Sequence, residues 1–185
     1  MMMLIASALV FVSALGLSTD LYDALSKAVM YPGTEWEYSS VPGATVYYDM
    51  FGFNTAFTRV AIGLILVSLV LFLTNTHSRR KYYIGNYIAT GLSAAAAIGV
   101  SVWCIPQIAD YKSQFINNVD FEALKAFSKD WGTLYIGPGD TFWFDICYFV
   151  FGFLLLSAVL LVVNCVLKVN VMKAEQAAIG SGKEG

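Results

Sequence analysis

Four long apolar stretches, separated by polar and aromatic segments, set the pattern of the chain. They cover residues 1–17, 60–76, 82–108 and 146–167, and none contains Asp, Glu, Lys or Arg. A membrane-spanning helix needs about 20 mostly apolar residues, and roughly 17 is the lower limit. The pattern therefore predicts an all-α membrane protein in which four transmembrane helices form one bundle.

The first stretch, residues 1–17, has two interpretations. Its length is at the lower limit for a span, and it also suits the apolar part of a secretory signal peptide. No Lys or Arg precedes it, and residues 16–19 offer no small-x-small cleavage pattern. We therefore favour a retained span, with a cleaved signal as the alternative.

The basic residues predict the orientation. Residues 77–81 read His-Ser-Arg-Arg-Lys, and the tail 168–185 carries further lysines, whereas the segments 18–55 and 106–142 are rich in Asp and Glu. Short basic loops stay on the cytoplasmic side of a membrane. Both termini are thus expected inside and the two acidic loops outside. The expected location is the plasma membrane, with an organelle inner membrane as the alternative.

The two outside loops hold the candidate interface residues. Runs 35–39 and 44–51 are aromatic and β-branched and flank Val41-Pro42-Gly43, which predicts a small extracellular β-hairpin. In the second loop, near-helical spacing of phenylalanines after Asp120 predicts a short amphipathic helix. The aromatic side chains expected to contact partners are Trp36, Tyr38, Tyr47, Tyr48, Phe121 and Phe127. Trp143 and Phe144 are interpreted as an aromatic belt, with a binding box as the alternative.

Small residues recur every four positions in the third span. Gly91, Ala95 and Gly99 would form a ridge that lets another helix approach closely. We expect this ridge to pack within the bundle, with dimerisation as the alternative. Two charges lie at span ends, Arg59 before the second and Asp145 before the fourth, and they are predicted to form an intramembrane ion pair.

Composition limits the functions that the chain can have. Apolar residues make up 58% and charged residues 13%, and four spans leave no room for a separate soluble domain. A formal net charge of −2 argues against nucleic-acid binding. With one histidine, no CxxC pair and no catalytic grouping, we expect no enzyme activity, no cofactor and no metal site.

The layout resembles the claudin-type tetraspans, a group that includes claudins, peripheral myelin protein relatives, fungal eisosome-type tetraspans and amastins. The resemblance rests on an Arg opening span two (TAFTRVAIG), on SVWCIPQIADY in span three and on YIGPGDTFWF before span four. Loop one contains Trp36 but lacks the Gly-Leu-Trp motif and both cysteines of claudins. The resemblance implies a left-handed bundle beneath a small extracellular sheet, acting through lateral contacts.

Two functions from different classes remain open, and a third has less support. The first is a membrane organiser, adhesion-type protein or auxiliary subunit that contacts lipids, other membrane proteins or copies of itself. The second is an accessory subunit of a large energy-converting complex of the respiratory or ATP-synthase type, which cysteine-free outside loops would suit. A small channel or transporter would need polar residues along a path, and spans two and three supply almost none.

Overall fold

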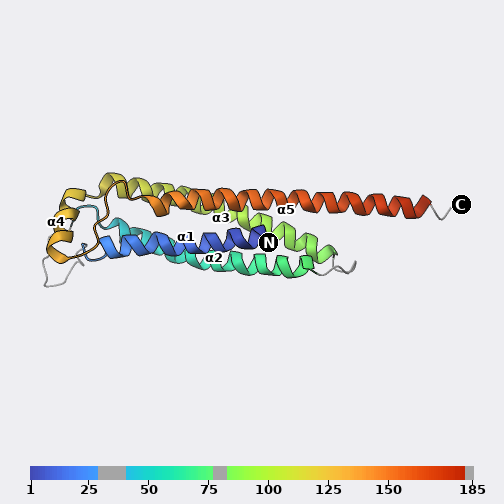
Figure 1. Cartoon of the computed structure of the whole chain (residues 1–185), viewed down its shortest axis with the longest axis horizontal. Helices are drawn as coiled ribbons and strands as arrows, with labels where there is room; N and C mark the ends of the chain where they lie inside the picture. The colour runs from blue at the N-terminus through green and yellow to red at the C-terminus, as the bar shows by residue number, and fades with distance from the viewer. Residues whose placement is uncertain (29–40, 77–82, 182–185) are drawn as a thin grey trace.

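The computed structural model describes residues 1–28, 41–76 and 83–181 and folds them into five helices (Figure 1). The helices are α1 (Met2–Leu25), α2 (Val46–Thr76), α3 (Tyr83–Asn118), α4 (Phe121–Trp131) and α5 (Phe142–Ser181). All but α4 are long and apolar enough to cross a membrane. The chain is therefore a multi-pass membrane protein with four candidate spans, as the apolar pattern predicted.

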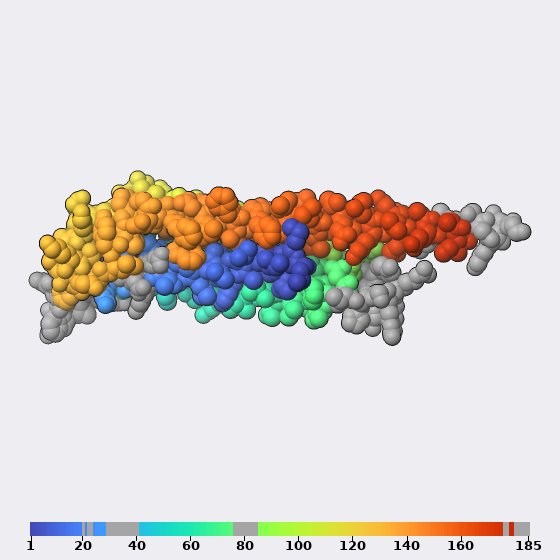
Figure 2. Space-filling model, in the orientation of Figure 1, coloured from blue at the N-terminus to red at the C-terminus, as the bar shows by residue number. Residues whose placement is uncertain are grey.

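The four long helices form a closed ring. α1 packs against α2 and α5, and α3 packs against the same two helices, so α2 and α5 lie diagonally opposite each other. The short helix α4 lies across one end of the bundle, which we call the α4 end (Figure 1). At the opposite end, the tail end, α5 continues well past the start of α1, as Figure 2 shows in blue and orange to red.

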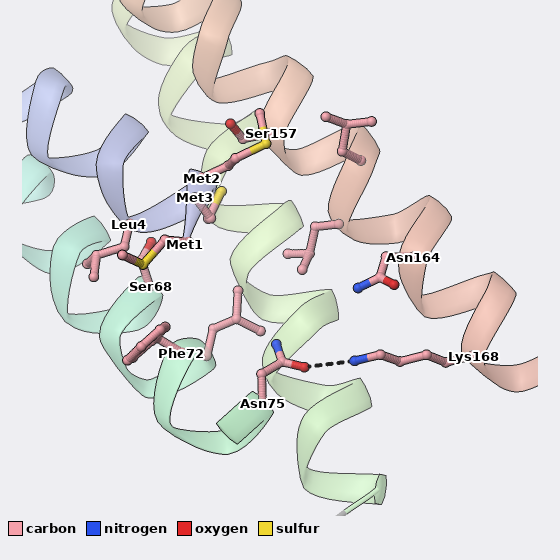
Figure 3. Close-up of a pocket in the computed structure, with 13 residues that line it drawn as sticks. Met1, Met2, Met3, Leu4, Ser68, Phe72, Asn75, Ser157, Asn164 and Lys168 are labelled. Carbon is pink, nitrogen blue, oxygen red and sulfur yellow. Dashed lines mark hydrogen bonds between the residues drawn. The ribbon is translucent and has the colours of Figure 1, made fainter. Parts of the chain in front are cut away.

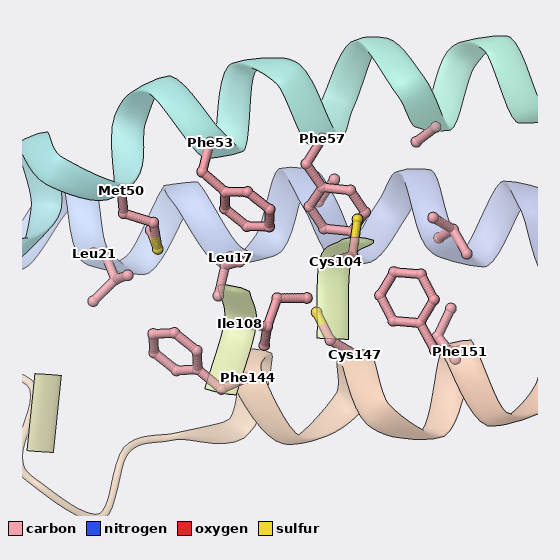
Figure 4. Close-up of a cluster of buried hydrophobic side chains, with 14 of the residues drawn as sticks. Leu17, Leu21, Met50, Phe53, Phe57, Cys104, Ile108, Phe144, Cys147 and Phe151 are labelled. Atoms are coloured by element: carbon pink, nitrogen blue, oxygen red, sulfur yellow. The ribbon is translucent and has the colours of Figure 1, made fainter. Parts of the chain in front are cut away.

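Aromatic rings fill the middle of the bundle. Phe57 of α2 stacks on Phe53 at 5.7 Å and on Phe151 of α5 at 5.9 Å between ring centroids. Cys104 and Cys147 face the same interior as free thiols, and both are fully buried (Figure 4). Side chains from all four long helices thus meet in one core, where close packing holds the ring together.

The predicted second strand of the hairpin is helical instead. Residues 44–51 form a turn and the beginning of α2, and residues 35–39 lie outside the described residues. Met50, Phe53 and Phe57 are buried at helical spacing. The aromatic and β-branched composition of residues 44–51 suggested a strand, but the burial gained by extending this apolar face favours helix over local propensity.

The third long helix also extends beyond its predicted span. Residues 106–118 were expected in a loop, but α3 continues through Pro106 to Asn118. Cys104, Ile108 and Phe115 are each 0% exposed, and spacings of four and seven place them on one face. Neighbouring helices can compensate the hydrogen bond that a proline removes, so proline is tolerated in helices of this kind.

The predicted amphipathic helix in the second loop is α4, and both of its ends are capped. The carboxylate of Asp120 accepts hydrogen bonds from the backbone N–H groups of Glu122 and Ala123, and Gly132 closes the helix at φ 61°. Asp120 also donates its own backbone N–H to the carbonyl of Pro42. The helix is thereby attached to the segment that precedes α2.

Replacing the cap residue gives a first test of this arrangement. We expect Asp120→Ala to lower the free energy of unfolding by about 1 kcal/mol, because two backbone N–H groups lose their acceptor. Asp130→Ala is the matched control, since Asp130 lies exposed in the last turn of the same helix. Thermal unfolding in detergent measures both, and equal destabilisation by the two variants would contradict the capping role.

Candidate functional site

An arginine faces away from the bundle in the middle of α2. Arg59 is exposed, whereas Met50, Phe57 and Ala61 form the buried face of the same helix. At 3.6 residues per turn, Arg59 points in the opposite direction from this face. Within the described part of the chain the ion pair is that of Lys112 with Asp145, so Arg59 has no acidic partner there.

Charged residues of α2, α3 and α5 lie at one level near the α4 end, and the depth of Arg59 in the membrane is counted from that level. Tyr111 of α3 donates its hydroxyl to the backbone carbonyl of Asp49 of α2 at 3.0 Å, and Lys112 contacts Asp145 of α5 at 2.5 Å. Arg59 lies ten residues beyond Asp49 along α2, which is about 15 Å of helix. An apolar layer of about 30 Å that begins at these charges would place the Arg59 backbone near its middle.

Small residues surround Arg59 on the outward face of α2. Gly52, Ala56 and Gly63 share its side of the helix. A Cβ atom placed on Gly52 or Gly63 would meet nothing within 4 Å. Another membrane helix could therefore lie close to the α2 backbone on both sides of the guanidinium.

The predicted ion pair between Arg59 and Asp145 does not form. Asp145 instead accepts hydrogen bonds from Lys112 and, at 2.7 Å, from the hydroxyl of Thr141. The reason is that α2 begins at Val46 rather than near residue 60, which moves Arg59 from the end of the helix to its middle. The two helices are also diagonal in the ring.

The small-residue ridge of α3 does not pack within the bundle either. Gly91, Ala95 and Gly99 are exposed, and a Cβ on either glycine would meet nothing within 4 Å. The buried face of α3 is formed instead by residues such as Ala94 and Ala97. The three small residues do lie on one face of α3, as their spacing predicted, but the spacing alone could not show that this face points away from the bundle. Dimerisation through this ridge stays a prediction.

The aromatic residues predicted for loop one divide into two groups. Trp36 and Tyr38 lie outside the described residues. Tyr47 is only 6% exposed, and Tyr48 is half-buried with its hydroxyl donated to the backbone carbonyl of Ser26 at 3.1 Å. Tyr48 thus connects the beginning of α2 to the end of α1, and Tyr47 is buried, so the two rings do not form a free surface.

The two phenylalanines predicted for the second loop also have internal contacts. Phe121 is half-buried and meets Phe115 of α3 edge to face at 5.3 Å. Phe127 is 8% exposed and stacks on Trp131 at 5.9 Å. The ring of Phe121 thus packs α4 against the end of α3, and Phe127 is buried beside Trp131 of its own helix, so both rings have internal contacts.

A cavity of about 390 Å³ lies at the tail end between α1, α2 and α5 (Figure 3). Lys168 donates to the side-chain oxygen of Asn75 at 3.1 Å, and Asn164 lies beside this bond in the view. Deeper in the cavity, the hydroxyl of Ser157 is buried and has no hydrogen-bond partner. The other lining residues are mostly apolar, so the cavity has a polar mouth and an apolar interior.

A second cavity, of about 270 Å³, lies at the α4 end between α1 and the segment that leads into α5. It is lined by four aromatic side chains, those of Tyr135, Phe142, Trp143 and Phe144, together with Asp140, Ile136, Leu17 and Leu21. We assigned Trp143 and Phe144 to an interfacial belt. The sequence signal for a cavity was the turn of residues 137–140, because it folds an aromatic segment back on itself.

Among the described residues, no group of three or more His, Cys, Asp and Glu side chains is placed to hold a metal ion. Comparison with known proteins adds no assignment, since no protein-family model, no curated protein and no solved structure matches the chain.

Proposed function

We propose that the chain is a non-enzymatic four-span membrane protein that acts through lateral contacts, as an organiser or auxiliary subunit of another membrane protein. In this proposal the α4 end faces outward and both termini face inward, as the basic loop 77–81 predicts. The claudin-type layout is part of the same proposal. The observation that carries it is the outward-facing Arg59.

In this proposal, Arg59 is an uncompensated charge in the apolar layer. An arginine at the centre of a membrane helix costs about 2.5–3.5 kcal/mol on insertion scales, and such residues usually pair with an opposite charge. Arg59 has no such partner within the described part of the chain. A carboxylate on the helix of another protein would remove this cost, and the small residues beside Arg59 would let that helix approach.

The charge also disfavours a second copy of the chain as the occupant of this face. In a symmetric dimer the same patch lies on both sides of the interface. Two copies of Arg59 would then meet at the same depth, and like charges in a medium of low dielectric repel strongly. The proposed partner is therefore a different protein with an Asp or Glu in a membrane helix.

Site-specific crosslinking tests the proposal. A photo-crosslinking amino acid at Gly63 faces outward next to Arg59, and one at Ile98 faces outward on α3 as the control position. We expect Gly63, but not Ile98, to capture a membrane protein with an acidic residue within a span. Arg59→Leu should reduce that capture at least about tenfold, and Arg59→Lys should retain most of it.

Each other outcome counts against the proposal. Capture of lipid alone at Gly63 would mean that Arg59 extends to a phosphate headgroup, and a capture that survives Arg59→Leu would mean that the charge plays no part. Recovery of the crosslinked chain in a fixed complex of many subunits would instead favour the accessory role in an energy-converting assembly.

A further inference from the structure

The cavity at the α4 end is formed by the segment that connects α4 to α5. Residues 137–140 make a tight turn in which Asp140 donates its backbone N–H to the carbonyl of Gly137 at 3.0 Å. The carboxylate of Asp140 in turn accepts the N–H of Gly137 at 2.6 Å. The turn therefore fixes the position of one carboxylate at the edge of the cavity.

Aromatic rings supply most of the remaining wall. Phe144 is 2% exposed and forms part of the bundle core, whereas Tyr135 is 39% and Phe142 is 64% exposed. Phe142 meets Trp143 edge to face, with 5.3 Å between the ring centroids. Phe142 is thus largely accessible and Tyr135 partly accessible, so two of the four rings are open to a ligand.

The electrostatic character of the cavity favours a cation. Aromatic faces carry partial negative charge and attract cations within about 6 Å of the ring centroid. Asp140 adds a full negative charge, and it forms no ion pair with any residue in the described part of the chain. Among the residues that the structure describes, no Lys or Arg lines the cavity. The described lining therefore combines a carboxylate with several rings and holds no competing cation.

We propose that this cavity binds a quaternary ammonium group. Such a cation has no N–H donors, so it loses few hydrogen bonds on entering a wall of rings with one carboxylate. A primary ammonium would bring three donors to a site where one oxygen of Asp140 already accepts the N–H of Gly137. The rings and the carboxylate thus discriminate between the two kinds of cation.

The position of the cavity indicates where the ligand comes from. Trp143 and Phe144 directly precede Asp145, which belongs to the level of charges at the α4 end, and Leu17 and Leu21 come from the last part of α1. This is the depth at which lipid headgroups meet the apolar layer. A volume of about 270 Å³ suits a headgroup rather than a whole lipid. A phosphocholine lipid and a soluble quaternary ammonium compound carry the same cationic group. The lipid-retention and titration measurements described next distinguish the two ligands.

The full chain in nanodiscs is the material for the test. Native mass spectrometry of lipids retained from equimolar phosphatidylcholine and phosphatidylethanolamine should show an enrichment of phosphatidylcholine of about tenfold. Titration with tetramethylammonium, followed by saturation-transfer NMR, reports on the cation alone. Binding of tetramethylammonium without lipid enrichment would support the site and assign it a soluble ligand. Absence of both signals would overturn the proposal.

Matched variants separate a binding site from a general interfacial belt. Asp140→Asn retains the oxygen that accepts the Gly137 N–H but removes the charge, and Tyr135→Leu removes a ring. Each should lower the enrichment and the tetramethylammonium signal about tenfold. Trp131→Leu is the control, because Trp131 is 53% exposed at the same end and does not line the cavity. An equal loss in the control would show that the rings act only as a belt.

Discussion

Replacement of Gly16 by leucine is expected to separate α1 from α5 and to leave little folded protein. A Cβ atom at Gly16 would lie 2.1 Å from two ring carbons of Trp143, so the ring occupies the space that any larger residue needs. Overpacking of a filled core costs about 1–3 kcal/mol when side chains can adjust. Here a whole indole has to leave its position, so we expect a loss of at least about 3 kcal/mol in the free energy of unfolding.

Gly91→Leu is the control for this prediction. The same change on the outward face of α3 meets nothing within 4 Å, so it should alter stability by less than about 0.5 kcal/mol. Detergent-solubilised protein, heated and then sized by chromatography, reports the folded fraction of each variant. A Gly91→Leu protein as unstable as Gly16→Leu would mean that the α3 ridge packs inside the bundle after all.

Gly43→Ala is expected to disrupt the α4 end with a loss of about 3 kcal/mol or more. Gly43 has φ +77°, and a Cβ there would lie 1.9 Å from the backbone carbonyl oxygen of Asn118. The left-handed conformation alone costs about 1–2 kcal/mol for a residue with a side chain. The clash adds to this cost, because the atom in the way belongs to the backbone at the end of α3.

Gly132→Ala isolates the conformational part of that cost. Gly132 also has a positive φ, +61°, but a Cβ there would meet nothing within 4 Å. This variant should therefore lose only about 1–2 kcal/mol. The midpoints of thermal unfolding of the two variants are compared. If they are equal, the contact between residues 43 and 118 does not contribute to stability.

The number of spans could be predicted from the sequence, whereas the helix ends could not. Uncharged runs such as 60–76 identify most of a span directly, because charges inside an apolar layer are rare and costly. Met50 and Phe115 lie outside these runs, yet each belongs to a helix that extends beyond its uncharged run. Their burial depends on contacts between segments distant in sequence, and local propensity does not contain that information.

Less of the candidate site than of the fold could be predicted from the sequence. Arg59 was recognised as a charge near a span, but its partner was misassigned because the depth of a residue depends on where its helix begins. The direction that Gly91 faces depends on which side of α3 meets α2 and α5. The cavity beside the turn at 137–140 could not be predicted, because it depends on where α1 lies relative to that turn.

The length of α5 has a mechanical consequence. It is one uninterrupted helix of 40 residues, about 60 Å long, whereas the apolar layer of a bilayer is about 30 Å thick. Trp143 beside the aromatic cavity and Met172, which accepts a hydrogen bond from Tyr87 at 3.4 Å, therefore belong to the same rod. Because α5 is uninterrupted, a tilt imposed on its tail would also displace the end that carries Trp143, against the packing of α1 and α3 on the same helix.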